Sequence, residues 1–159
     1  MRGIGILAML GISFAAGAQT PNDPTSFAGA ADVQALVAQI GQEMKPGQIF
    51  GMKPLVRAGV SVAAIEYWKG PGRPAVHPGD AEYVVVLAGS GTLVSGGTLA
   101  EPHVINPGLT DGSKIEGGTT RHIAQGDVFM IPAGVPHWFG VDNGKLALLG
   151  IKLPQPAKP

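Results

Sequence analysis

"GDVFMIPAGVPH" occupies residues 126–137 and combines a short strand-like run with a sharp turn. The run that follows Gly126 is rich in β-branched and aromatic residues, which is typical of a strand. Pro132 and Gly134 predict a turn, because proline fixes one backbone angle and glycine tolerates conformations closed to other residues. His137 follows at the start of the next strand-like run. The spacing therefore places an imidazole at a strand start, directly behind a rigid turn.

Similar strand-like runs fill most of the chain beyond Gln48, where the apolar pattern has a period of two residues. They are bounded by Gly, Pro, Asn or Asp, and they cover 55–69, 82–89, 91–97, 119–125, 127–132, 137–141 and 145–153. Short strands with closely spaced turn residues predict an all-β barrel or sandwich. The stretch 100–118 breaks this rhythm and is predicted to form a long loop.

The segment 27–45 has a different period. Its apolar residues recur at steps of three and four and form one stripe of an amphipathic helix: Val33, Leu36, Val37, Ile40 and Met44. Pro46 and Gly47 predict the end of this helix. We expect the stripe to pack against the outside of the sheet or at a subunit contact, and the alternative is a helix that binds a partner.

Composition narrows the classes of partner. The 159 residues suffice for one domain, and 11 basic residues balance 11 acidic ones. This balance argues against nucleic acid and anionic membranes and favours a small-molecule ligand. The chain has no cysteine, which excludes disulfides and thiolate metal sites.

The N-terminus predicts export. Arg2 precedes an apolar run that is too short to span a bilayer, and Ala16 and Ala18 form an A-x-A cleavage site. The alternative is a buried N-terminal helix. The predicted organisation is a signal peptide (1–18), a flexible leader with the amphipathic helix (19–47), a barrel (48–153) and a tail (154–159). The mature protein is expected in the periplasm or outside the cell, with no membrane span.

A second stretch, "HPGDAEYVVVLAGSGTL" (77–93), contains His77, then Glu82, then Gly89 after six further residues. With the spacing in 126–137, it resembles the cupin family, whose motifs are G-x5-H-x-H-x(3,4)-E-x6-G and G-x5-P-x-G-x2-H-x3-N. The second motif is matched from its first glycine through His137 and departs only at its last position, where this chain has Val141. The first motif is matched in part, because Ala75 stands where the family has its first histidine. The resemblance covers residues 55–153.

The resemblance implies a double-stranded β-helix (jelly-roll) barrel that holds a divalent metal ion inside one end. The implied ligands are His77, Glu82 and His137, and Glu82 is also the candidate catalytic residue, exchanging between ligand and base. Such a donor set suits Fe, Mn, Zn, Ni or Cu and leaves positions open for substrate. The resemblance also implies a homodimer. The alternatives are that His137 is a satisfied core histidine and that His77 is a turn residue.

Further residues bear on this site. Ala75 in place of a ligand implies weaker metal binding, a more open site or loss of the metal. Asp80 could compensate or could simply be a turn residue. His122 could be a fourth ligand or could lie outside, and His103 is expected to be solvated. Trp138 should point away from the site as a packing residue, and either Tyr67 or Trp68 should line the barrel.

Three functions remain open on the sequence alone. The first is a metal-dependent enzyme (a dioxygenase, isomerase or lyase) that acts on a small polar organic molecule. The second is a non-catalytic module that binds a sugar or metabolite. The third is an exported structural protein that uses the helix at 27–45 and an edge strand to bind a partner.

The export hypothesis predicts cleavage after Ala18. Protein purified from a bacterial periplasm should give, by mass spectrometry, a mature N-terminus at Gln19. An intact Met1 on the soluble protein would contradict this.

Overall fold

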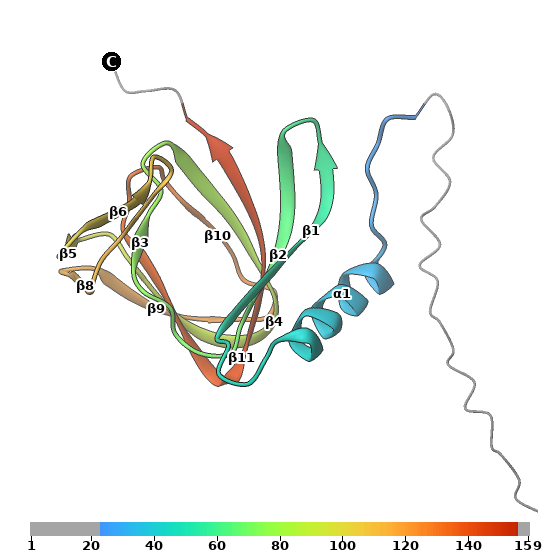
Figure 1. Ribbon diagram of the computed structural model, residues 1–159, viewed down its shortest axis with the longest axis horizontal. Helices are drawn as coiled ribbons and strands as arrows, with labels where there is room; N and C mark the ends of the chain where they lie inside the picture. The colour runs from blue at the N-terminus through green and yellow to red at the C-terminus, as the bar shows by residue number, and fades with distance from the viewer. Residues whose placement is uncertain (1–22, 156–159) are drawn as a thin grey trace, which may run out of the picture.

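The computed structural model describes residues 23–155 and shows one helix packed on the outside of an antiparallel β-barrel (Figure 1). The predicted signal peptide at 1–18 and the tail beyond residue 155 lie outside the described residues. The helix α1 spans Ala30–Glu43. The strands are β1 (Phe50–Ala58), β2 (Ser61–Trp68), β3 (Ala75–Val76), β4 (Asp80–Ser95), β5 (Thr98–Ala100), β6 (His103–Asn106), β7 (Leu109–Asp111), β8 (Lys114–Glu116), β9 (Thr119–Ala124), β10 (Val128–Ile131) and β11 (His137–Pro154).

The two longest strands, β4 and β11, hold the barrel together. They pair antiparallel from the contact of His137 with Ser95 to the contact of Pro154 with Asp80. β11 also pairs with β2 and β3, while β4 also pairs with β9 and β10. The all-β jelly-roll barrel predicted from the sequence is therefore confirmed. Among the described residues, no helix is long and apolar enough to cross a membrane.

Gly89 lies inside β4, although the sequence predicts separate strands at 82–89 and 91–97. Its φ is +78°, and a Cβ at this position would collide with the carbonyl oxygen of Lys145. The pairing with β11 shifts register on both sides of Gly89: between Ala147 and Leu148, opposite Ala88 and Val86, and between Val141 and Leu146. The first shift leaves Leu87 as an extra residue in β4, and such a bulge changes which alternate residues face inward: Val84 and Val86 are buried before it, and Leu93 is buried after it. The runs at 82–89 and 91–97 are thus one strand, and so are those at 137–141 and 145–153.

Two other expectations were wrong in detail. The run 55–69 is a hairpin, because Gly59, with φ +58°, turns the chain between β1 and β2. The predicted loop at 100–118 contains β6, β7 and β8. These strands have only three or four residues, and all of β6 is exposed. A period of two cannot be recognised in segments so short, and their strand form depends on pairing with neighbours.

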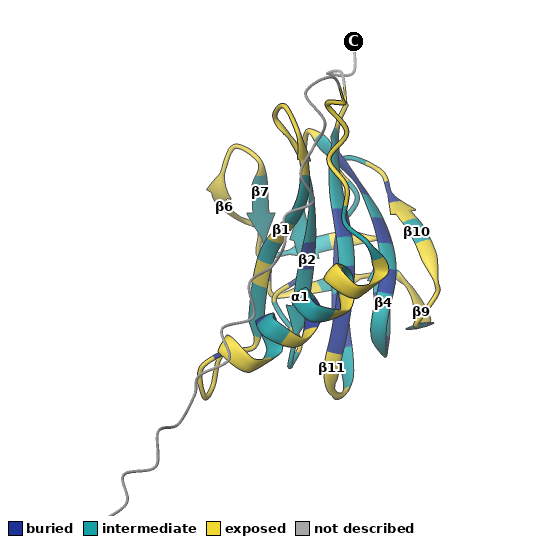
Figure 2. Ribbon diagram, turned by 90° about the vertical axis from the view of Figure 1, so that its right-hand side faces the viewer, coloured by how far each residue is buried: buried dark blue, intermediate teal, exposed yellow. Residues whose placement is uncertain are grey.

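The hydrophobic core has two parts. The first fills the barrel and consists of Val84, Val86, Leu93, Ile123, Ile131, Phe139, Leu146 and Leu148. The second lies between the barrel and α1 and consists of Val37, Ile40, Met44, Ile65 and Ala147. Figure 2 shows α1 crossing the outer face of the sheet near β1 and β2. The apolar stripe of the helix therefore packs within the chain, as expected.

The close packing of α1 generates a stability prediction. Ile40 is 3% exposed, and its side chain would lie 2.9 Å from a Cβ placed on Gly51 of β1. Ile40→Ala should lower the free energy of unfolding by about 2–4 kcal/mol, because it removes buried methyl groups and leaves a cavity. The exposed Gln34→Ala on the same helix should change it little. Equal urea midpoints for both variants would mean that α1 does not pack on the barrel.

Candidate metal centre

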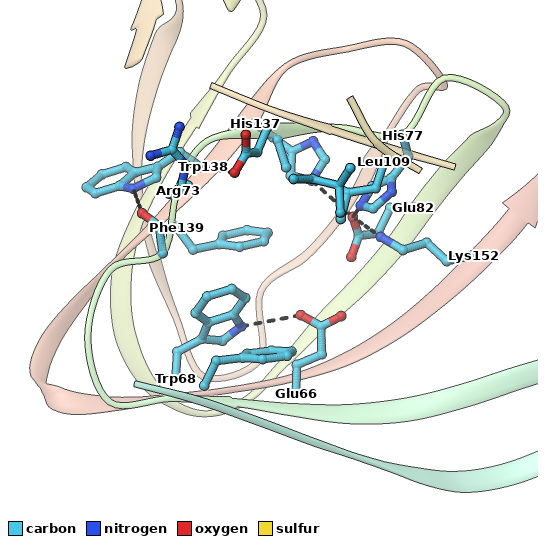
Figure 3. A pocket seen from close by; sticks show the side chains of 15 residues that line it. Glu66, Trp68, Arg73, His77, Glu82, Leu109, His137, Trp138, Phe139 and Lys152 are labelled. Atoms are coloured by element: carbon cyan, nitrogen blue, oxygen red, sulfur yellow. Dashed lines mark hydrogen bonds and ion pairs between the residues drawn. The ribbon is translucent and has the colours of Figure 1, made fainter. Parts of the chain in front are cut away.

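His77, Glu82 and His137 converge at one end of the barrel (Figure 3). His77 follows β3, Glu82 lies in β4, and His137 begins β11. One ligand atom from each lies within 4.8 Å of the other two. Glu82 and His137 are 2% and 5% exposed. Oε2 of Glu82 lies 3.2 Å from Nε2 of His137 and 3.8 Å from Nε2 of His77.

The turn in the second motif joins the two histidine segments. Gly134 has a φ of +77°, and its N–H donates a hydrogen bond to the carbonyl oxygen of His77 at 2.9 Å. The N–H of Val135 donates to the carbonyl of Pro132 at 3.2 Å and closes the turn. The proline and glycine found in the sequence therefore aim His137 inward and also fix the backbone of His77.

Both imidazoles are oriented by backbone carbonyls. Nδ1 of His77 lies 3.0 Å from the carbonyl oxygen of Gly108, and Nδ1 of His137 lies 3.1 Å from that of Val135. A carbonyl oxygen only accepts hydrogen bonds, so each Nδ1 carries a proton and each ring turns its Nε2 toward Glu82, where Nε2 can offer a lone pair to a metal or, when it too is protonated, an N–H to the carboxylate. Burial, and next the Lys152 ammonium, lower the pKa of His77, which favours the neutral form that binds metals.

The donor set fits a divalent cation. Two Nε2 lone pairs and a carboxylate oxygen repel one another unless a proton or a cation lies between them. Oε2 of Glu82 is buried and, among the described residues, accepts no hydrogen bond of good geometry. Burial by itself would raise the pKa of Glu82, but contact with His137 and the charge of Lys152 outweigh it and lower the pKa to about 2. The cluster could therefore hold a divalent metal through an ionised carboxylate and two imidazoles.

Lys152 is a neighbour of this cluster that was missed in the sequence. It lies directly opposite Glu82 in the pairing of β11 with β4, and its Nζ is 2.6 Å from Oε2 of Glu82. Its side chain is 38% exposed. Its relation to Glu82 depends on the register of two strands far apart in the chain, for which the sequence offers no evidence.

Glu66 is a second carboxylate that was missed. It lies in β2 and accepts a hydrogen bond from Nε1 of Trp68 at 3.3 Å. Burial, and next the charge of Glu82, raise the pKa of Glu66 to about 7. A Cβ on Gly150 would lie 3.2 Å from Oε1 of Glu66 and 3.7 Å from Oε1 of Glu82, so this glycine leaves room for both carboxylates.

The cluster opens into a cavity of about 290 Å³. One wall is aromatic: the ring centroids of Phe50 and Trp68 are 4.3 Å apart, and those of Trp68 and Phe139 are 6.2 Å apart. Of Tyr67 and Trp68, it is therefore Trp68 that lines the barrel. Trp138, expected to point away, also lines this cavity, and its Nε1 donates to the carbonyl of Gly72 at 2.9 Å.

The other residues considered from the sequence differ in whether they face the site. Ala75 lines the cavity and pairs with His137, so the position of the missing family ligand faces the site. Asp80 pairs with Pro154 at the start of β4 and belongs neither to the cluster nor to the cavity wall. The side chain of His122 is 67% exposed and lies 3.3 Å from Asp142, so it is not a fourth ligand. His103 is exposed, as expected.

Several solved structures share the fold. They include hydroquinone 1,2-dioxygenase PnpCD in complex with Cd2+ and 4-hydroxybenzonitrile. This match covers 76% of this chain and 72% of that chain, with 15% sequence identity and a TM-score of 0.54. The match to DMSP lyase DddQ from Ruegeria pomeroyi DSS-3 covers 87% of this chain and 71% of that chain, with 18% sequence identity and a TM-score of 0.54. The match to FeII HppE covers 70% of this chain and 54% of that chain, with 14% sequence identity and a TM-score of 0.50. At such identities the likeness shows the fold alone.

No curated protein sequence is significantly similar to the chain. The Cupin family, in contrast, matches residues 52–158, which include both motifs and every residue that lines the cavity except Phe50. With more than half of the sequence matched and the barrel in place, the chain belongs to the cupin family.

Proposed function

We propose that this cupin is an exported metal-dependent enzyme that acts on a small organic molecule in the barrel mouth. The observation that carries the proposal is the buried His77–Glu82–His137 cluster, with both Nε2 atoms turned toward one carboxylate oxygen at the inner side of a cavity. Two histidines and one carboxylate with open positions are the donor set of non-haem Fe(II) oxygenases. The likeness to a dioxygenase, to FeII HppE and to a lyase supports an enzyme of this general kind.

The residues would share the chemistry as follows. His77, Glu82 and His137 would hold the metal, which, when bound, supplies a Lewis acid or a site for O2. The aromatic wall of Phe50, Trp68 and Phe139 would bind the apolar part of the substrate and exclude water.

Proton transfer is better assigned to Glu66 than to Glu82. A general base works best when its pKa lies near the working pH, and the pKa of Glu66 is about 7, while that of Glu82 is about 2. From the sequence, Glu82 was both a candidate metal ligand and the catalytic candidate. We keep it as a metal ligand alone and propose Glu66 as the group on the cavity wall that accepts or returns the proton.

One observation favours a second function, a non-catalytic small-molecule binder. The Lys152 ammonium lies 2.6 Å from Glu82 and already balances the charge of that carboxylate without a metal. A metal-free cavity of the same shape could still bind a sugar or metabolite. Metal content distinguishes the two functions.

The enzyme proposal predicts that the cluster binds metal as a unit. Glu82→Gln and His137→Ala should each lose almost all bound metal after loading with Fe(II) or Zn(II), because two ligands make a poor site. Elemental analysis measures metal per chain. His103→Ala, a matched histidine outside the cluster, should keep it. Full metal content in Glu82→Gln would contradict the proposal, and no metal in the wild type would favour the binder.

Restoring the missing family ligand should tighten the site. Ala75 lines the cavity opposite His137, so Ala75→His adds a third imidazole from the correct side. We expect metal affinity, measured by competition with a chelator dye, to rise by about tenfold or more, given that even outer-shell contacts are worth ~10–100-fold. An unchanged affinity would mean that residue 75 does not reach the metal.

The raised pKa of Glu66 predicts a specific pH dependence in the metal-free protein. Between pH 4.5 and about pH 7 the Glu66 carboxyl holds more protons in the folded state than in the unfolded state, so its contribution to the free energy of unfolding should fall as the pH rises through this window. Glu66→Gln lacks this carboxyl, so its stability relative to the wild type should increase between about pH 5 and pH 8. Urea unfolding in the presence of a chelator measures this. Parallel pH profiles would show that the pKa of Glu66 is not raised.

A further inference from the structure

We propose that Lys152 makes the metal-loaded cavity a binding site for small carboxylates with an apolar or aromatic body. This inference rests on the proposed function and names its class of substrate. Lys152 lies outside both sequence motifs. Its ammonium has no free lone pair while it is protonated, so it cannot be a metal ligand.

Without a metal, Lys152 and Glu82 form a closed pair. They are direct cross-strand neighbours, with Nζ and Oε2 2.6 Å apart, and neither charge is free to bind a ligand. The lysine side chain is 38% exposed while that of Glu82 is 3% exposed, so the lysine is the mobile partner of the two. Its flexible stem allows the ammonium to turn from Glu82 toward the cavity that both residues line.

With a divalent cation on Glu82, the charges in the cavity no longer balance. A divalent cation and the Lys152 ammonium, set against one carboxylate, leave a formal surplus of two positive charges, and an ionised Glu66 would still leave one. Arg73 adds nothing to this sum, because its Nε lies 2.7 Å from Oδ2 of Asp111 at the cavity wall. An anion is the ligand that neutralises the surplus, and a carboxylate can accept hydrogen bonds from the ammonium.

The rest of the cavity restricts the body of the ligand. Phe50, Trp68 and Phe139 form one wall, and Ile105 and Leu109 also line the space. A volume of about 290 Å³ lies at the small end of the range for ligand sites. The cavity therefore suits one small ring or a short apolar chain bearing a carboxylate, and it disfavours a neutral polyhydroxylated sugar.

Benzoate and benzamide test the inference, because they have the same shape and differ in charge. With Zn²⁺-loaded wild-type protein, isothermal titration calorimetry should give benzoate an affinity on the order of tenfold higher than that of benzamide. Both tryptophans of the chain line the cavity, so their fluorescence gives an independent readout of binding at this place. Benzoate should raise the affinity for Zn²⁺ by the same factor by which Zn²⁺ raises the affinity for benzoate.

Variants identify the residue responsible. Lys152→Gln should clearly reduce the preference for benzoate over benzamide, because it removes one of the two surplus charges, and Lys152→Arg should retain it. Lys145→Gln is the matched control, since Lys145 is an exposed lysine in the same strand. An undiminished preference in Lys152→Gln would overturn the inference. Equal affinities for the two probes in the wild type would also overturn it, and that result needs no variant to fold.

Metal uptake is measured separately in the same samples. Wild-type protein that takes up no Zn²⁺ would overturn the proposed function, and this inference with it. Protein that takes up Zn²⁺ but does not distinguish benzoate from benzamide would overturn the inference alone.

Discussion

An ionised carboxylate inside the barrel is the constraint on which the rest of the site depends. Glu82 is 2% exposed, and a buried charge is costly unless opposite charges or hydrogen-bond donors surround it. Three nitrogen atoms, from His77, His137 and Lys152, lie within 3.8 Å of its Oε2. The lone pairs of the two histidines repel the carboxylate unless a cation or a proton lies between them. Lys152 instead brings a positive charge of its own to the carboxylate. This arrangement is the basis of our proposal that the site has two states, one with a metal and one closed by Lys152.

The barrel brings these groups together through strand pairing. Glu82 and Lys152 meet because β4 and β11 pair over almost their full lengths. The bulge at Leu87 allows that pairing to continue while the inward face changes from even- to odd-numbered residues of β4. At the other end of the site, the hydrogen bond from Gly134 to His77 ties the turn before β11 to the segment before β4. The helix α1 supports the outer face and takes no part in the cavity.

The sequence predicted the parts of this arrangement that depend on local spacing. His77, Glu82 and His137 follow from motif intervals, and the turn at Pro132–Gly134 follows from residue types with special backbone preferences. Glu66 and Lys152 could not be predicted, since they approach Glu82 only through the register of β2 and β4 with β11. The short strands within 100–118 were missed for a related reason: three or four residues are too few to show a period, and pairing partners give them their form.

Anomalous diffraction from crystals of the Fe(II)-loaded protein tests most directly whether two imidazoles and one carboxylate hold a metal. We expect one peak at the absorption edge of iron, about 2.0–2.2 Å from Nε2 of His77, Nε2 of His137 and an oxygen of Glu82. We also expect Nζ of Lys152 to have left the oxygen that faces the metal. Crystals that show no peak at this place, with Lys152 still paired to Glu82, would contradict the account.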